Sequence, residues 1–488
     1  MSINKKRIIY LLGALLIVIS LTMTPSLLVA LIYKEYKCAK AFIFTISLCL
    51  LIGIAFKRNH KFEFSKFNNR EGYLIVTLCW FLSSIFGCLP FIISGSIPNI
   101  IDAFFETCSG FSTTGASILT DIEALPMSML FWRSFTHWVG GMGIIVFAMA
   151  FLPKLGISGQ LIASAETPGP TLDKLTPRFS DTAKNLYLIY LFISILEVLL
   201  LLLGGLNLFD ALIHTFGTVG TGGFSNHNAS VAYYDSDFVH WIIIIFMIIS
   251  GTNFNLYYLS LKKGLNTIFK DEEFKFYIST ITLFAFFITL CLLLNGKENN
   301  FFTALTKATF QVSSIVTATG FATDDFDIWP TFAKMLIFIL MFMGASSSST
   351  GGGVKMIRIL VALKLIFRGF SLKTHNTRII SVKINKKALP SDTISNIANF
   401  IFLYIATVLL ATFLISVDNF DILTNLSSVA ACIANIGPGF SLVGPTMNYS
   451  MFSGFSKIIL SIVMIAGRLE LFTFFILFSR YYRDPNRA

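Results

Sequence analysis

The chain has 488 residues, of which 55% are hydrophobic and only 13% are charged, a balance that excludes an ordinary soluble globular domain and predicts a polytopic membrane protein. The formal net charge of +11 would suggest nucleic-acid binding only if the positions of the charged residues along the chain were ignored. The charges are sorted by side of the predicted membrane, so we expect no nucleic-acid partner. The seven cysteines are scattered, and we interpret them as small hydrophobic residues in helices.

Apolar runs long enough to cross a hydrocarbon core of about 30 Å recur along the chain. The first covers residues 8–33 and follows the basic residues at 5–7. We expect a first membrane helix there rather than a signal peptide, because the run is long and no small-residue cleavage site stands out. Later runs cover 187–203 and 394–417. The sequence therefore predicts an all-α fold, with two leading transmembrane helices in residues 1–70.

Four similar units follow the leading helices, each with a spanning helix, a short amphipathic segment, a glycine-bearing turn and a second spanning helix. We place them at 71–155, 156–265, 266–388 and 389–488. The amphipathic segments are too short to span, and we interpret them as half-helices that enter the membrane and stop. The turns after them read SGFSTTGAS (109–117), GTVGTGGFS (217–225), SSIVTATGFAT (313–323) and ANIGPGFSLVGP (434–445).

These glycine-bearing turns have the chemistry of a cation pore. A dehydrated alkali cation needs several oxygens around it, and a short strand with a central glycine can aim successive backbone carbonyls at one axis. Threonine before the glycine adds hydroxyl oxygens, and the half-helix turns its partially negative C-terminal end toward the ion. One such loop would also fit an ordinary turn or a close helix contact. Four in register favour four pore loops in pseudo-fourfold arrangement around one pore.

Basic and acidic residues alternate between the connecting loops. Lys and Arg gather at 57–70, 262–275 and 373–387, so the positive-inside rule predicts that these loops and both termini are cytoplasmic. The opposite connections carry acidic residues, at 102–123, 210–237, 324–327 and 418–421. We expect that outer surface to concentrate cations.

Unit 3 contains a polar interruption, GASSSSTGGGVKM (344–356), in its second helix. It fails the phosphate-loop template, because Lys355 is neither preceded by glycine at the required place nor followed by Ser or Thr. A broken helix at membrane depth is tolerated where it lines a water-filled cavity, so 344–353 is a candidate gate. A small-residue patch for tight helix packing is the alternative. The candidate gate residues of this segment are Gly344, Ser346, Ser347, Gly351, Gly352, Gly353 and Lys355.

A few ionisable residues lie in or beside the expected spans. Arg468 lies in an apolar span that we expect between 455 and 478, where an ionised side chain is costly unless it faces water or a partner. Glu470 is on a different helical face, so we expect no simple pair between these two neighbours. His137 fits packing or hydrogen bonding better than a proton relay. Arg133 and Glu197 also lie in or beside spans, and Glu197 could pair with a basic residue of a neighbouring helix. We assign a transport role to neither His137 nor Glu197.

These motifs together resemble the Trk/Ktr/HKT superfamily of potassium transporters, most of all its bacterial TrkH branch. The resemblance covers essentially the whole chain and is carried by TTGAS, VGTGGFS, ATGFATDD, NIGPG, HWVGGMG, SSSSTGGGVKMIR and GRLELF. It implies a potassium selectivity filter with one key glycine per loop: Gly115, Gly223, Gly320 and Gly437. The carbonyls just before them would line the ion sites: Thr113, Thr114, Thr221, Gly222, Ala318, Thr319, Asn435 and Ile436. The TVGTG stretch centres instead on Gly220, which leaves the second loop uncertain by three residues.

The resemblance also implies a gate and partners. Segment 344–353 would obstruct the pore, and Arg468 would face the pore below the filter as an electrostatic barrier. An arginine bound to helix-end carbonyls, or to Glu470 of another helix, is the alternative. The family implies a homodimer and a cytoplasmic nucleotide-binding regulatory subunit of the TrkA type. The basic stretch 368–387 would dock that subunit or meet anionic membrane lipid.

The predicted function is channel-like potassium uptake across the bacterial cytoplasmic membrane, with potassium as bound substrate ion, rubidium as its analogue and no cofactor in this chain. The fourth loop lacks threonine and carries Asn435 and Pro438, so selectivity over sodium should be less sharp than in a symmetric filter. The alternative is a sodium- or proton-coupled symporter, which predicts inverted repeats and midplane carboxylates. We expect no enzyme, because no set of nucleophile, base or metal ligands converges.

Overall fold

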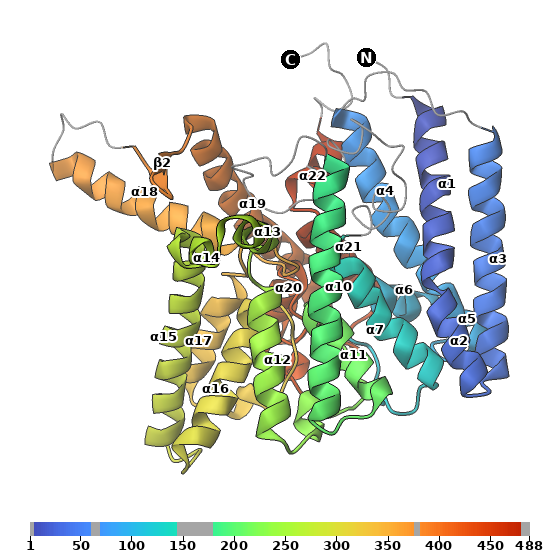
Figure 1. Ribbon diagram of the computed structural model, residues 1–488, viewed down its shortest axis with the longest axis horizontal. Coiled ribbons are helices and arrows are strands. Elements are labelled where there is room, and N and C mark those ends of the chain that lie inside the picture. The colour runs from blue at the N-terminus through green and yellow to red at the C-terminus, as the bar shows by residue number, and fades with distance from the viewer. Residues whose placement is uncertain (1–3, 60–68, 144–178, 375–380, 480–488) are drawn as a thin grey trace.

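The computed structural model describes residues 4–59, 69–143, 179–374 and 381–479. Most helices run along one direction, and the described chain begins and ends at the same end of the bundle (Figure 1). Within these residues, six helices are long and apolar enough to cross a membrane, or eight spans if each of two bent helix pairs counts as one. The predicted all-α polytopic membrane fold is confirmed.

The leading helices form one edge of the bundle, drawn in blue in Figure 1. Helices α1 (Lys5–Thr22) and α2 (Thr24–Ile32) form one continuous span, and α3 (Tyr36–Asn59) returns beside them. Two glycines let α1 and α3 approach closely, because a Cβ built on Gly13 would lie 2.8 Å from the carbonyl oxygen of Gly53. The expected first membrane helix is therefore present.

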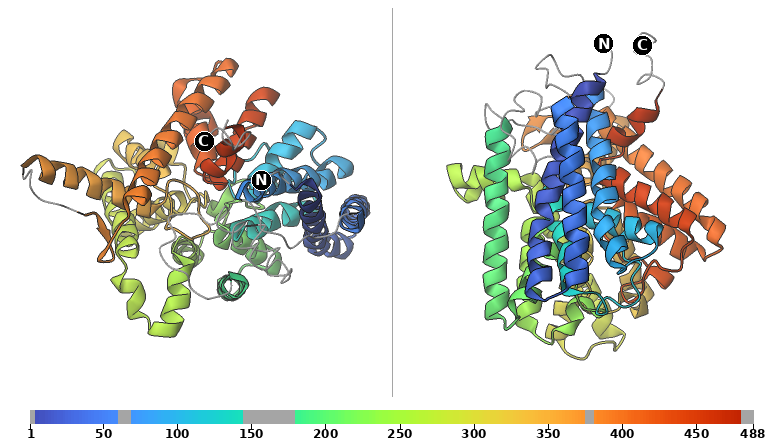
Figure 2. Two further views of the ribbon diagram at one scale, coloured as in Figure 1. Left: turned by 90° about the horizontal axis from the view of Figure 1, so that it is seen from above. Right: turned by 90° about the vertical axis from the view of Figure 1, so that its right-hand side faces the viewer.

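Grouped by the four predicted units, the remaining helices succeed one another around the centre of the molecule when seen from above (Figure 2). Unit 1 contains α4 (Asn69–Gly87), α5 (Leu89–Ser94), α6 (Ile100–Phe111) and α7 (Met127–Gly141). Unit 2 contains α10 (Phe179–Leu203), α11 (Leu208–Val219), η2 (Ser230–Tyr233), α12 (Asp237–Ser250) and α13 (Phe254–Lys263). Unit 3 contains α14 (Asn266–Lys270), α15 (Glu272–Leu294), α16 (Phe301–Val316), η3 (Phe326–Ile328), α17 (Thr331–Met341) and α18 (Met356–Thr374). Unit 4 contains α19 (Ser391–Ile415), η4 (Ser416–Asp418), α20 (Ile422–Ile433), η5 (Ser441–Val443), α21 (Gly454–Arg468), α22 (Phe472–Phe475) and η6 (Ile476–Phe478).

A small hairpin ends unit 3. Strand β1 (Lys383–Ile384) pairs antiparallel with β2 (Lys387–Ala388), with Lys383 opposite Ala388. The two turn residues have positive φ, 50° at Asn385 and 66° at Lys386, as a two-residue hairpin turn requires. The hairpin packs a small buried cluster at the base of α18, apart from the larger clusters that fill the bundle.

Four short helices, α6, α11, α16 and α20, correspond to the predicted half-helices, and we refer to them as the pore helices after that prediction. With 12 to 16 residues they are shorter than a membrane span. Each begins at a polar N-cap whose side-chain oxygen accepts a backbone N–H of the first turn, which satisfies donors that the helix leaves unpaired. These caps are Asn99, Asn207, Asn300 and Asp421.

The expected apolar span between 455 and 478 is present as a bent helix pair and not as one continuous helix. Helix α21 ends at Arg468, and the chain then bends by 111° into α22 and η6. Glu470 and Leu471 have positive φ values of 57° and 45°, which end the helix. The Glu470 carboxylate forms an ion pair with Arg358 of α18, so the break is held by a tertiary contact that hydropathy does not report.

Candidate functional site

All four pore helices end in the same hydrogen-bonded turn. In this Schellman motif, two backbone N–H groups beyond the helix donate back to carbonyls of its last turn. The first residue beyond the C-cap donates to a carbonyl three residues earlier: Thr113 to Gly110, Thr221 to Thr218, Ala318 to Ile315 and Asn435 to Cys432. The next residue donates to a carbonyl five residues earlier: Thr114 to Ser109, Gly222 to Gly217, Thr319 to Ser314 and Ile436 to Ala431. The predicted filter segments thus start from one repeated geometry.

The backbone conformation that follows is also repeated. The first residue beyond each C-cap is not glycine, yet it has positive φ: 57° at Thr113, 52° at Thr221, 61° at Ala318 and 56° at Asn435. Two residues later a glycine has positive φ: 79° at Gly115, 77° at Gly223, 83° at Gly320 and 96° at Gly437. Non-glycine residues at positive φ cost on the order of 1–3 kcal/mol each and cluster at functional sites.

The four glycines close a ring. A Cβ built on each would lie less than 3.0 Å from a carbonyl oxygen of the next loop, closer than real Cβ atoms approach. The oxygen always belongs to the residue just before the next glycine: Gly115 meets Gly222, Gly223 meets Thr319, Gly320 meets Ile436 and Gly437 meets Thr114. Each loop therefore touches its successor, and the fourth touches the first.

The second loop aligns with the other three on Gly223. Gly220 is the C-cap of α11, with a φ of −73°, and its N–H donates to the carbonyl of Phe216. Gly223 has the positive φ and the neighbour contact that Gly115 has in loop 1. Of the two registers that the sequence leaves open, this geometry matches the one centred on Gly223.

The side-chain oxygens of the filter segments are used unequally. The Thr114 hydroxyl accepts a hydrogen bond from the Asn435 amide at 3.0 Å, and that amide also donates to the Met464 carbonyl at 3.0 Å. The Thr319 hydroxyl lies 2.8 Å from that of Thr317. By contrast, the buried Thr113 Oγ1 and Asn435 Oδ1 have no hydrogen-bond partner among the described residues. Buried oxygens without a partner are costly unless an ion or water meets them.

The candidate gate segment lies between α17 and α18. Gly344 and Gly353 mark its two ends, where a Cβ on Gly353 would lie 2.8 Å from the Gly344 Cα, so the segment closes on itself. The Ser346 N–H donates to the Gly251 carbonyl at 3.0 Å, which joins the segment to the bend between α12 and α13. The backbone and hydroxyl of Ser347 donate to the Glu273 carboxylate of α15, at 2.6 and 2.7 Å.

Two glycines place this segment against the ends of two pore helices. A Cβ on Gly351 would lie less than 3.0 Å from the carbonyl oxygen of Thr317, the C-cap of α16. A Cβ on Gly352 would lie equally close to the carbonyl oxygen of Ala434, the C-cap of α20. The Lys355 ammonium donates to the Gly351 carbonyl within the segment. The segment is therefore seated directly at the ends of the helices from which loops 3 and 4 start.

Arg468 joins this segment to unit 1. Its guanidinium donates to the carbonyls of Thr350 at 2.6 Å, Gly140 at 2.6 Å and Gly141 at 2.8 Å. Gly140 and Gly141 end α7, so the helix-end carbonyls that the sequence left as one alternative are among its partners. Glu470 pairs with Arg358 instead, a partner that sequence reasoning did not identify.

A protein-family model for TrkH, described as a cation transport protein, matches residues 36–486. The chain belongs to the TrkH family. It is 39% identical to the Trk system potassium uptake protein TrkH of Salmonella typhimurium, over 96% of this chain and 97% of that protein. It is 33% identical to the Trk system potassium uptake protein TrkG of Escherichia coli, over 96% and 97%. The crystal structure of the potassium transporter TrkH from Vibrio parahaemolyticus matches with a TM-score of 0.89 at 34% identity, covering 99% of this chain and 100% of that one.

The three ionisable residues His137, Glu197 and Arg133 differ in the contacts that they make. The His137 Nδ1 donates a 2.7 Å hydrogen bond to the Gly110 carbonyl, and the ring centre lies 4.1 Å from that of Phe224, which fits hydrogen bonding and packing. The expected ion pair of Glu197 is not found in the described part of the chain, where its carboxylate is buried. Arg133 forms an ion pair with Glu106, which the sequence analysis did not single out.

Three acids of the expected outer surface form ion pairs with lysines. Lys307 lies 3.2 Å from Asp324, Lys334 lies 3.5 Å from Asp327, and Lys457 lies 2.6 Å from Asp102.

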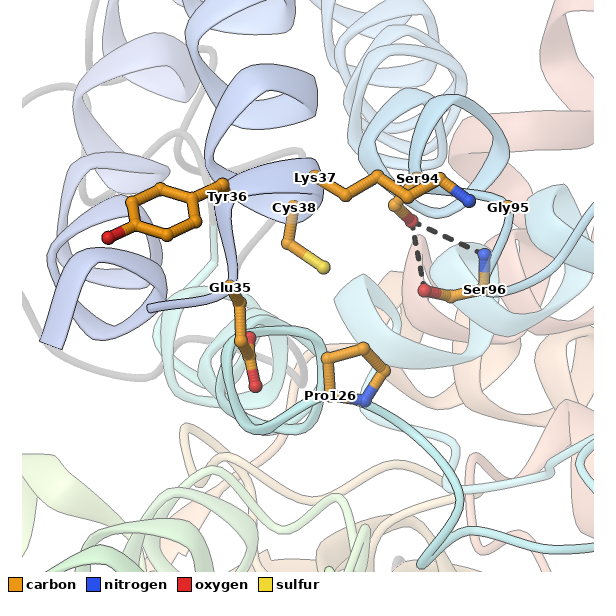
Figure 3. Close-up of a pocket in the computed structure, with 8 residues that line it drawn as sticks. All are labelled: Glu35, Tyr36, Lys37, Cys38, Ser94, Gly95, Ser96 and Pro126. Carbon is orange, nitrogen blue, oxygen red and sulfur yellow. Dashed lines mark hydrogen bonds between the residues drawn. The ribbon is translucent and has the colours of Figure 1, made fainter. Parts of the chain in front are cut away.

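A hollow of about 420 Å³ opens at the turn between the leading spans (Figure 3). It is lined by Glu35, Tyr36, Lys37, Cys38, Ser94, Gly95, Ser96 and Pro126. None of these belongs to the four filter segments, so the hollow is separate from the candidate ion path.

Proposed function

We propose that this chain takes up potassium across the bacterial cytoplasmic membrane through a filter formed by its four glycine-bearing loops. The observation that carries the proposal is the closed ring, in which each filter glycine meets the carbonyl just before the glycine of the next loop. The names of the relatives, potassium uptake proteins of Trk systems, supply the ion. Rubidium is the natural analogue for measurement.

The filter segments would replace the water around the ion. Carbonyls of the residues before each glycine supply oxygens, and the pore helices add the negative ends of their dipoles. The unpartnered Thr113 hydroxyl and Asn435 amide oxygen are two further oxygens for an ion or its water. The Asn435 amide group is already engaged with Thr114 and Met464, so the fourth loop offers a different oxygen set from the other three.

Segment 344–353 and Arg468 would form the gate. Gly351 and Gly352 lie against the ends of α16 and α20, so ions that leave loops 3 and 4 would meet this segment. Arg468 holds it to α7 through carbonyls of two different units. We propose that a cytoplasmic, nucleotide-binding regulatory subunit moves the segment and that the protein works as a homodimer, with basic residues of 368–387 available for that subunit or for anionic lipid.

Coupled symport is the second candidate. The observation that favours it is Glu197, a buried carboxyl on α10 that forms no ion pair in the described residues, since ionisable groups in membrane spans commonly mark ion or proton pathways. A symporter predicts that a sodium or proton gradient drives rubidium uptake at zero membrane potential. A channel predicts uptake that follows the membrane potential alone.

The test is rubidium-86 uptake into potassium-loaded liposomes that contain the purified chain, with and without the cytoplasmic subunit. We expect uptake that external potassium blocks and sodium blocks weakly. Gly223→Ser places a Cβ against the Thr319 carbonyl at positive φ, and we expect it to reduce uptake by about tenfold, equivalent to ~1.4 kcal/mol. Gly205→Ser is the matched control, because Gly205 also has positive φ, 91°, but a Cβ there meets nothing within 4 Å.

Uptake that both variants reduce equally would show that backbone strain, and not the ring contact, causes the loss. A folded wild-type protein that transports no rubidium even with its regulatory subunit would refute the proposed function.

A further inference from the structure

A buried ion pair lies behind the first two filter loops. The Arg133 Nε of α7 and the Glu106 Oε1 of α6 are 2.5 Å apart, and their side chains are 2% and 0% exposed. Loss of either partner would leave an uncompensated buried charge, which is strongly destabilising. What this pair holds follows from its other hydrogen bonds.

The Glu106 carboxylate hydrogen-bonds the segment that follows the first filter glycine. Its Oε2 accepts the backbone N–H of Ile118 at 2.9 Å, and its Oε1 accepts the Ser117 hydroxyl at 3.0 Å. Ser117 and Ile118 come two and three residues after Gly115. The carboxylate therefore fixes the first filter segment from the side of its exit, while the Schellman turn fixes its start.

The Arg133 guanidinium reaches the second filter loop. Its Nη1 donates to the Ser225 carbonyl at 3.0 Å, and its Cζ lies 3.4 Å from the centre of the Phe224 ring. Phe224 and Ser225 directly follow Gly223. The pair thus spans the junction at which Gly115 meets the Gly222 carbonyl.

The same position is polar in every unit. The residue nine positions before the filter glycine is Glu106 in unit 1, His214 in unit 2, Gln311 in unit 3 and Ser428 in unit 4. His214 lies 3.2 Å from the Ser225 hydroxyl, and Gln311 donates to the Asp324 carbonyl at 3.3 Å. In units 1, 2 and 3 the polar residue at this position therefore hydrogen-bonds the segment that follows the filter glycine. In unit 1 the ion pair of Glu106 with Arg133 also reaches the next loop.

We infer that Glu106 and Arg133 are positioning residues that set the spacing between filter loops 1 and 2, and through it the preference for potassium over sodium. The inference rests on the proposed function of these loops as an ion filter. A filter that discriminates by the size of its carbonyl cage, or by the number and direction of its carbonyl dipoles, depends on that spacing. Neither residue contacts the ion in this scheme, because both act through the backbone behind the ring.

Ion-dependent thermal stability measures the preference without requiring an open gate. An ion that binds only the folded protein stabilises it by RT ln(1 + [ion]/Kd) and so raises the unfolding midpoint. Titrations of the purified chain with potassium and with sodium, at constant ionic strength, therefore give a ratio of apparent affinities. We expect Glu106→Gln to lower this ratio by about tenfold, which corresponds to ~1.4 kcal/mol. Unit 3 already holds glutamine at this repeat position, so the substitution should be compatible with the fold.

Two further variants test whether a lowered potassium-to-sodium ratio comes from altered spacing of the loops or from an unpaired buried charge. Arg133→Lys keeps a cation beside Glu106 but lacks the forked group that reaches Ser225 as well, and we expect a lowered ratio. Glu106→Gln with Arg133→Met removes both charges, and we expect the ratio to stay low because the bridge to loop 2 is gone. A double variant with the wild-type ratio would overturn the inference.

Glu71→Gln is the matched control, because Glu71 also forms a buried pair, with Arg7 at 2.8 Å, but between α4 and the leading helix α1. We expect it to lower the unfolding midpoint without changing the potassium-to-sodium ratio. An equal change of the ratio in this control, or an unchanged ratio in Glu106→Gln, would also overturn the inference. A wild-type midpoint that responds to neither ion would refute the proposed filter itself, and is distinct from both outcomes.

Discussion

Replacement of Arg468 tests the gate most directly. Its guanidinium bonds the Thr350 carbonyl of the candidate gate segment and the Gly140 and Gly141 carbonyls at the end of α7. If opening moves the segment away, the bond to Thr350 is lost. A hydrogen bond to a charged group contributes about 1.5–3 kcal/mol, so Arg468→Ala should raise the ratio of open to closed protein by about 10- to 150-fold.

The assay is the open probability of single proteins in planar bilayers with potassium as the permeant ion. Arg468→Lys separates two explanations, because lysine keeps the positive charge but cannot reach three carbonyls with a planar fork. If Arg468 acts as a tether, the lysine variant opens almost as readily as the alanine variant. If it acts as an electrostatic barrier, lysine keeps the wild-type conductance and alanine raises it. Wild-type open probability and conductance in the alanine variant would refute both roles.

Two predictions concern other described residues. Gly352→Ala places a Cβ less than 3.0 Å from the Ala434 carbonyl oxygen and should displace the candidate gate segment. We therefore expect rubidium flux to change at least tenfold (~1.4 kcal/mol) while the stabilisation of the fold by potassium is kept. Unchanged flux would contradict a contact between this segment and the end of α20. Asp421 caps α20, and hydrogen bonding from Thr424 lowers the pKa of its carboxyl. The cap stabilises the fold above the unfolded-state pKa and is lost as pH falls through the lower folded-state pKa, so Asp421→Ala should cost about 1 kcal/mol in thermal unfolding at neutral pH and nothing in strong acid. An equal cost at both pH values would contradict this.

Much of the fold was predictable from local sequence. A long apolar run that crosses the membrane is expected to be a helix, because a helix pairs its backbone N–H and C=O groups within the same segment. The polar caps Asn99, Asn207, Asn300 and Asp421 fix where the pore helices start. Repetition along the chain then predicted four equivalent loops, and the backbone angles of these loops repeat in the same way.

The sequence placed the second-loop glycine at Gly223 but left this register uncertain, because two glycines that fit a filter motif lie three positions apart. Only the contact with the neighbouring loop distinguishes them: Gly223 meets the Thr319 carbonyl, whereas Gly220 packs against the His137 backbone. The bend after Arg468 was missed for a related reason. Hydropathy measures how apolar a segment is, and the ion pair between Glu470 and Arg358 joins residues 112 positions apart.

The sequence by itself thus determined the class of the protein, its membrane helices and the residue types of the four loops, because these follow from composition, hydropathy and short-range repeats. Whether those filter residues bind potassium stays a prediction. Only the tertiary structure decided which glycine meets which carbonyl, that Arg468 joins units 1, 3 and 4, and that Glu106 and Arg133 join two filter loops. The physical reason is distance along the chain: these contacts link residues that only the closed arrangement of the four units brings together.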